Sequence, residues 1–314
     1  MDTNEMNAAT SAALVGVGKM GANMARRLKD CGFSLVALYD SNPELAEALA
    51  TELGCSSYTS LAKLAAAADV IITVASDDVP MQEIYFRPND NLFMQATGKL
   101  FINCATITPR VHVDLYAAAQ NQGAYILEAP MASSIHQARQ GELYLMCAGD
   151  EATFQKAMPV LEALSSQTVF VGEPGRAAQL KALVNMVMNM NTAALAEGLG
   201  LADALGLDLT LVQQVFAQTG ANSRVLETDG SDMQHQEHDA FFTAAHAAKD
   251  SAIALGLGQE QGLPMVLAAA TEGQYQRMVQ LGLGNLDKSG ISELTFLNRT
   301  LLSGKNGLTT NSVG

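Results

Sequence analysis

The chain of 314 residues has few basic side chains: 18 Lys and Arg stand against 32 Asp and Glu, giving a formal net charge of −14. Nucleic-acid partners normally require clustered Lys and Arg, so this balance argues against binding to a phosphate backbone. It also argues against adhesion to anionic membranes. No segment has the length and purity of a transmembrane span, so we expect no membrane partner.

The chain is also poor in cysteine, and its start does not resemble a secretory signal. None of the four cysteines is paired at the spacing of a metal site or a disulfide framework. The first residues are acidic and polar, without the basic region and apolar run of a signal peptide. We therefore expect reduced cysteines in a cytoplasmic protein. The cysteines are Cys31, Cys55, Cys104 and Cys147.

Strand-like and helical patterns alternate in the first half of the chain. Such alternation indicates crossover units and a mostly parallel sheet. Strands are predicted over residues 12–18, 34–40, 70–76, 100–105, 124–129, 143–148 and 168–171. Helices are predicted over residues 20–30, 42–53, 61–68, 108–120 and 151–164.

Beyond residue 172 the strand patterns end and only helical periods follow. The sequence therefore predicts an α/β domain over residues 1–172. An interdomain helix and an all-helical domain are expected over residues 173–303. The polar, glycine-containing stretch 304–314 is expected to be a disordered tail.

A G-x-G-x-x-G pattern joins the first predicted strand to the first predicted helix. Alone the pattern is weak, but this strand-to-helix context is the one that dinucleotide binding requires. The first glycine allows a tight turn, the second lets backbone approach a pyrophosphate, and the third lets the helix pack close to the sheet. The helix N-terminus then offers N–H groups to the anion. The motif predicts a Rossmann-type domain and consists of Gly16, Val17, Gly18, Lys19, Met20 and Gly21.

Asp40 ends the second predicted strand, roughly 20 residues after the glycine motif, where a carboxylate can accept both ribose hydroxyls of an adenosine. Such a carboxylate repels a 2′-phosphate, so it favours NAD over NADP. The alternative is that Asp40 caps the following helix. Ala75 and Ser76 end another predicted strand and are expected beside the same cofactor.

A row of polar side chains follows a helical stretch that is otherwise apolar. Lys181, Asn185 and Asn189 stand at i, i+4 and i+8, so they share one helical face. A helix apolar nearly all round is expected to be buried, and a buried ammonium is costly unless it is paired, hydrated or used. One interpretation is a proton donor or acceptor beside a ligand. The other is a lysine that snorkels out of a packed helix.

Several motifs, taken in order, resemble those of the β-hydroxyacid dehydrogenase family. Residues 16–25 are similar to the family's G-x-G-x-M-G-x-x-M-A, and residues 103–109 to its D-x-S-T-x-x-P. Lys181 and Asn185 match K-x-x-x-N, with the lysine in the catalytic place. The resemblance covers nearly the whole chain.

The resemblance implies an oxidoreductase that transfers a hydride between a nicotinamide cofactor and a small β-hydroxy acid or its semialdehyde. Thr106 is then expected to approach the nicotinamide, and Lys249 to close over the cofactor with Asp250 close by. Phe242 and Asp250 are further candidates for substrate binding. Lys181 is expected to act as general acid and base, and Asn185 to orient the substrate oxygen or the lysine. Asn189 is expected to bond a neighbouring helix instead.

The loop at residues 128–134 departs from the family's D-A-P-V-S-G-G. Ala132 replaces the serine, and Ser133 and Ser134 replace the two glycines. Relatives use this loop to hold the substrate carboxylate, so both serines are candidate substrate residues, and the usual substrates are in question. The alternative is that the two hydroxyls only cap the following turn.

Two other functions stay open: an imine reductase-like enzyme of the same fold, which Lys181 and Asp40 both oppose, and a non-catalytic dinucleotide-binding interaction module.

The polar stretch 235–239 contains two histidines but lacks the H-E-x-x-H spacing, so we interpret it as a solvated turn and expect no metal. The resemblance also implies a homodimer or homotetramer formed through the helical domain.

Overall fold

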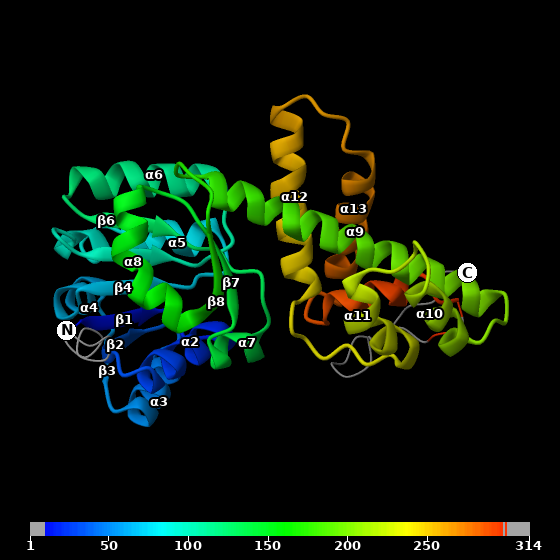
Figure 1. Cartoon of the computed structure of the whole chain (residues 1–314), viewed down its shortest axis with the longest axis horizontal. Helices are drawn as coiled ribbons and strands as arrows, with labels where there is room; N and C mark the ends of the chain where they lie inside the picture. The colour runs from blue at the N-terminus through cyan, green and yellow to red at the C-terminus, as the bar shows by residue number, and fades with distance from the viewer. Residues whose placement is uncertain (1–9, 298, 300–314) are drawn as a thin grey trace. The chain divides into compact units, whose positions relative to one another are not determined.

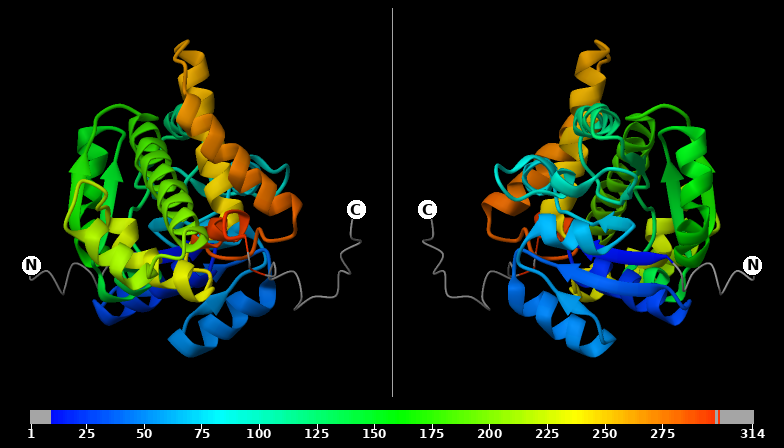
Figure 2. Two further views of the ribbon diagram at one scale, coloured as in Figure 1. Left: turned by 90° about the vertical axis from the view of Figure 1, so that its right-hand side faces the viewer. Right: turned by 90° about the vertical axis from the view of Figure 1, so that its left-hand side faces the viewer.

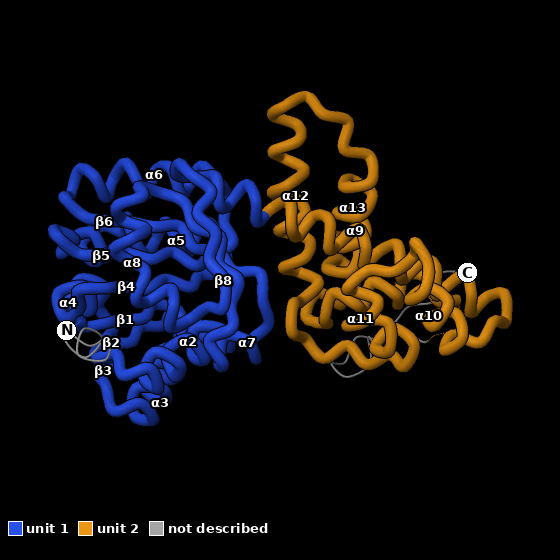
Figure 3. Tube along the Cα trace, viewed as in Figure 1, with its two compact units in different colours: residues 1–181 blue, residues 182–314 orange. Residues whose placement is uncertain are grey.

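The structure is a computed structural model that describes residues 10–297 and residue 299 (Figure 1). The chain divides into two units, residues 1–181 and residues 182–314 (Figure 3). The predicted tail over residues 304–314 lies outside the described residues. In the part of the chain that the structure describes, every helix is too short or too polar to cross a membrane.

A six-stranded parallel sheet in the order β3-β2-β1-β4-β5-β6 forms the centre of the first unit. This order reverses between β1 and β4, which is the topological switch point of a doubly wound fold. The prediction of an N-terminal Rossmann-type domain is confirmed. The strands are β1 (Ser11–Val15), β2 (Ser34–Tyr39), β3 (Ser56–Ser57), β4 (Val70–Thr73), β5 (Leu100–Asn103) and β6 (Tyr125–Glu128).

Helices cover both faces of this sheet because its central strands are apolar on both sides (Figure 1). Leu14 and Ile72 pack into one hydrophobic cluster, whereas Ala13 and Ile71 pack into the other, as the alternation of a strand requires. The helices are α2 (Lys19–Asp30), α3 (Pro43–Leu53), α4 (Leu61–Ala67), α5 (Asp78–Phe86), α6 (Pro109–Asn121), α7 (Ile135–Gln140) and α8 (Glu151–Leu164), with the 3₁₀ segment η1 (Leu92–Gln95).

The last two predicted strands do not extend the main sheet. β7 (Leu143–Cys147) and β8 (Ser165–Phe170) form a separate two-stranded parallel sheet. The chain folds back after β6, so that Glu128 bridges Ala148 and Met131 bridges Leu145 in antiparallel fashion. A buried apolar run predicts a strand but carries no information on which edge it joins.

Helices make up the second unit, and no strand occurs among its described residues, in agreement with the prediction. Helices α12 and α13 lie side by side and are joined by a short turn (Figures 1 and 2). Their buried residues share a core with the later turns of α9, including Leu195, Tyr275 and Met278. The elements are α9 (Arg176–Ala204), which begins in the first unit, α10 (Leu209–Ala217), α11 (Arg224–His235), α12 (Ala244–Glu260), α13 (Val266–Gln280) and the 3₁₀ segment η2 (Lys288–Leu294).

The interpretation of residues 235–239 as a solvated turn is wrong for its second histidine. His235 ends α11, but His238 is only 6% exposed. The Nδ1 atom of His238 lies 2.8 Å from Ser289 Oγ, and its Nε2 atom lies 3.3 Å from Glu293 Oε1. Hydrogen bonds to η2 therefore compensate the burial of these polar groups, which a local pattern cannot reveal.

Candidate functional site

The glycine motif forms the turn between β1 and α2. The space around the backbone differs at each of its three glycines. Gly16 has a φ of +92°, and a Cβ added there would lie 2.1 Å from the carbonyl oxygen of Val74. A Cβ added to Gly21 would lie 1.9 Å from the carbonyl oxygen of Gly16, so helix and turn are in close contact. A Cβ on Gly18 would meet no atom within 4 Å. The turn is therefore tight on its inner side and open at Gly18.

The N-terminus of α2 is suited to an anion. Gly18 occupies the N-cap position, and no side chain among the described residues caps the helix there. First-turn N–H groups of a helix lack intrahelical partners, and the helix dipole favours negative charge at this end. With the open space at Gly18, these groups fit a dinucleotide pyrophosphate.

Asp40 follows β2 directly and is linked to the glycine turn. Its Oδ2 atom accepts the N–H of Val17 at 2.8 Å, and its Oδ1 atom accepts the N–H of Asn42 at 2.9 Å. The alternative that Asp40 caps the next helix is wrong, because Asn42 is the N-cap of α3. Each carboxylate oxygen has a second lone pair, so the group can accept ribose hydroxyls as well.

Two further loops reach the same edge of the sheet. Ala75 and Ser76 follow β4, and Thr106 follows β5. The carboxylate of Asp78 joins these loops, since it accepts the N–H of Thr108 at 2.8 Å and its hydroxyl at 2.7 Å. Asp78 was not among the predicted site residues, because its partner Thr108 is 30 residues away in the sequence.

The two serines that replace the family's glycines form hydrogen bonds with the loop and with the elements next to it. Ser133 Oγ donates to the carbonyl oxygen of Ala132 at 2.6 Å and accepts the N–H of Tyr144 at 2.9 Å. Ser134 is the N-cap of α7 and forms a capping box with Gln137. The capping alternative therefore describes Ser134.

The three polar side chains on α9 are buried, but the helix is not buried on every side. Lys181 is 8% exposed, Asn185 2% and Asn189 0%. Leu183 and Val187 on the same helix are 47% and 48% exposed, so the expectation of burial all round is wrong. Polar side chains are buried here and apolar ones are exposed, which is the reverse of an ordinary amphipathic helix.

Within the second unit, the polar row is bonded to α12. Asn185 Nδ2 donates to Asp250 Oδ2 at 2.5 Å, and Lys249 Nζ lies 2.9 Å from Asp250 Oδ1. Asn189 Nδ2 donates to Ser251 Oγ at 2.9 Å, in agreement with the expectation that it bonds a neighbouring helix. Asp250 thus holds both Asn185 and Lys249 in fixed positions.

Phe242 lies apart from this bonded group, at the segment that precedes α12. Its ring stacks with that of His246, and its N–H donates to Asp287 at 2.9 Å.

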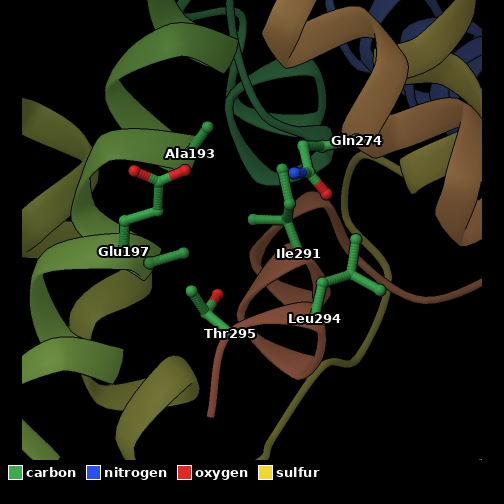
Figure 4. A pocket seen from close by; sticks show the side chains of 7 residues that line it. Ala193, Glu197, Gln274, Ile291, Leu294 and Thr295 are labelled. Carbon is green, nitrogen blue, oxygen red and sulfur yellow. The ribbon is translucent and has the colours of Figure 1, made fainter.

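A small pocket among α9, α13 and η2 has Glu197 and Gln274 in its wall (Figure 4). None of the residues that line this pocket was predicted as a site residue.

Comparison with known proteins covers both units. The model of the NAD-binding domain of 6-phosphogluconate dehydrogenase matches residues 11–172, and the NAD-binding model of NADP-dependent 3-hydroxyisobutyrate dehydrogenase matches residues 175–295. The chain belongs to the β-hydroxyacid dehydrogenase family. Relatives in this family include oxidoreductases that act on CH–OH groups.

Among curated relatives of this family member, glyoxylate/succinic semialdehyde reductase 1 of Arabidopsis thaliana is 28% identical and is matched over 91% of this chain and 98% of its own length. The mitochondrial 3-hydroxyisobutyrate dehydrogenase of Mus musculus is 27% identical, over 92% of this chain and 88% of its own length. The structure of the Mycobacterium tuberculosis 3-hydroxyisobutyrate dehydrogenase with L-serine has a TM-score of 0.82 and 26% identity, over 91% of this chain and 98% of the other.

We predict that two alanine substitutions in the glycine turn separate folding from cofactor binding. Gly16→Ala should lower the melting temperature, because strain at positive φ costs about 1–3 kcal/mol and the added methyl group also meets the Val74 carbonyl. Gly18→Ala should leave the melting temperature nearly unchanged and weaken dinucleotide binding by about 10-fold or more, because the methyl group occupies the approach of the pyrophosphate. Differential scanning fluorimetry and NADH titration test both. Unchanged NADH affinity in Gly18→Ala would contradict the assignment.

Proposed function

We propose that the chain is an NAD-dependent dehydrogenase or reductase of small β-hydroxy acids and their semialdehydes, with Lys181 as general acid and base. The observation that carries this proposal is the burial of Lys181, in the K-x-x-x-N segment of a chain that belongs to this family. A lysine on the same buried helical face as Asn185 is suited to hold or move a proton at a ligand.

The glycine turn and the N-terminus of α2 would hold the pyrophosphate, and Asp40 the adenosine ribose. Ala75, Ser76 and Thr106 would line the cofactor at the strand ends, and Lys249 would contribute from α12. When bound, the nicotinamide supplies the hydride chemistry. The protein then has to place the substrate and move one proton.

Lys181 would move that proton at the substrate oxygen. In reduction its ammonium donates a proton to the oxygen, and in oxidation its amine accepts the hydroxyl proton. Asp250 fixes the amide of Asn185 through a 2.5 Å hydrogen bond, which supports a role for Asn185 in orienting the substrate oxygen or the lysine. Ser133 and Ser134 remain our candidates for contact with the substrate carboxylate, through a loop whose shape their own hydrogen bonds determine.

We predict that Lys181→Ala lowers turnover about 10²–10⁴-fold because the proton donor is lost. NADH affinity should stay nearly unchanged, because the glycine turn and the N-terminus of α2 are intact. A panel of β-hydroxy acids and semialdehydes is assayed with NAD and NADH. Lys63→Ala on the exposed face of α4 is the control and should keep full activity. Wild-type turnover in Lys181→Ala would refute the role of the lysine. Tight NADH binding without turnover of any compound by the wild type would favour a non-catalytic module.

For the cofactor, we predict a kcat/KM for NAD that exceeds the value for NADP by about 10-fold or more, because the Asp40 carboxylate repels a 2′-phosphate. Asp40→Asn removes the charge and should reduce this ratio. Asp69→Asn is the matched control and should leave the ratio unchanged, because Asp69 precedes β4 and bonds Ser11 at the start of β1, whereas the glycine turn follows the end of β1. A wild-type preference for NADP would contradict the assignment.

The helical unit also supports self-association. Leu201 on the last turn of α9 and Leu205 directly after this helix are 62% and 67% exposed, and Leu211 and Val215 on α10 are 58% and 51% exposed. Large apolar side chains exposed to water are unfavourable, and several on consecutive elements favour an interface there. We propose a second copy of this chain as the partner, in a homodimer or homotetramer.

We predict that Leu205→Glu shifts the protein toward monomer in size-exclusion chromatography with light scattering, because the carboxylate would be buried without a partner. Leu45→Glu on α3, where the leucine is 48% exposed, is the matched control and should not change the molecular mass. A wild-type monomer at micromolar concentration would overturn the proposal.

A further inference from the structure

A buried carboxylate connects the end of the main sheet to the start of α9. Glu128 is the last residue of β6 and is 5% exposed. Its Oε1 atom accepts the N–H of Gly175, and its Oε2 atom accepts the N–H of Ala178 at 3.1 Å. The main chain of Glu128 also exchanges two hydrogen bonds with Ala148, at 2.9 and 3.1 Å. All of these residues lie in the first unit.

These bonds supply partners that the helix cannot provide for itself. The first N–H groups of a helix lack intrahelical acceptors and are ordinarily capped by a neighbouring side chain. Here one carboxylate from a distant strand spans the first turn of α9 with both oxygens. Two bonds at different points of the turn fix both the position of the helix along its axis and its rotation about that axis.

Lys181 lies one helical turn beyond Ala178, so its side chain follows any rotation of this first turn. On its other side, Glu128 leads directly into Ala129, Pro130 and the loop that carries Ser133. One buried side chain therefore links the helix that bears the lysine to the loop that we propose for the substrate.

We infer that Glu128 is a positioning residue for the reaction: its carboxylate holds the first turn of α9 so that Lys181 is placed for proton transfer. This inference rests on the proposed function of Lys181. A displacement of about 1 Å at a reacting group can lower turnover roughly 10²-fold. Glu128 itself contacts neither substrate nor cofactor in this role.

The ionisation of this group supports the choice of substitutions. Burial raises the pKa of Glu128 to about 7, and the N–H groups of the α9 start act in the opposite direction. The ionised form, which accepts two N–H groups, therefore predominates at pH 8. Gln keeps the shape of the side chain but turns one acceptor into a donor that faces an N–H group. Asp keeps both acceptors and the charge, and the family pattern has Asp at this place.

The test compares kcat and NADH affinity at pH 8 for Glu128→Gln and Glu128→Asp. We expect kcat to fall about 10–10²-fold in Glu128→Gln with NADH affinity unchanged, and to stay within about 3-fold of wild type in Glu128→Asp. Wild-type kcat in Glu128→Gln would overturn the inference. If that variant does not fold, Gly175→Ala replaces it and is assayed below its own melting temperature, because alanine at a φ of +90° is strained. Its added methyl group lies 3.2 Å from Val113 Cγ2 and disturbs the same hydrogen bond from the helix side.

A double-mutant cycle with Lys181→Ala separates positioning from general destabilisation. If Glu128 acts through the lysine, Glu128→Gln lowers kcat no further in the Lys181→Ala background. An equal fall in both backgrounds would overturn the inference. Wild-type kcat in Lys181→Ala itself would refute the proposed function. A low kcat in Lys181→Ala together with a wild-type kcat in Glu128→Gln would refute the positioning role alone.

Discussion

The site in the first unit depends on parallel strand pairing. Because β1 pairs in parallel with both β2 and β4, and β4 with β5, the four strands end at one edge of the sheet. The glycine turn, Asp40, Ser76 and Thr106 are widely separated in the chain but meet at this edge. Hydrogen bonds from Asp40 to Val17 and from Asp78 to Thr108 then join neighbouring loops. The sheet brings the loops together, and these two carboxylates determine their arrangement.

A second constraint is the burial of polar groups on α9. An unpaired buried amide or charge costs several kcal/mol, which is of the order of the whole stability of a domain. Asn185 and Asn189 avoid this cost by bonding Asp250 and Ser251 of α12. At the start of the same helix, Glu128 satisfies two N–H groups from β6. The helix is thus held by specific polar contacts in addition to apolar packing, and this makes it suited to carry a residue whose position matters.

The strands and helices that were predicted with bounds in the first unit lie within a few residues of those bounds, and helix α8 over residues 151–164 was predicted at its observed ends. Strand β3 and helix α7 were not predicted. The strands ended earlier than predicted; β1 ends at Val15 because Gly16 already has positive φ. Larger errors concerned partners. The separate sheet of β7 and β8, the burial of His238 and the bond between Ser133 and Tyr144 each depend on residues beyond the local pattern. Local periodicity does not contain that information.

The sequence alone determined the alternation of strands and helices, the glycine motif in its strand-to-helix context and the polar row of Lys181, Asn185 and Asn189, because each is a local property of spacing and residue type. Only the tertiary structure decided that Asp40 accepts the N–H of Val17, that Asp250 holds Asn185, and that Glu128 caps α9. In each of these hydrogen bonds the donor and the acceptor are far apart in the chain and are brought together by the fold. A short-range pattern can show that a polar group needs a partner, but the fold decides which residue becomes that partner.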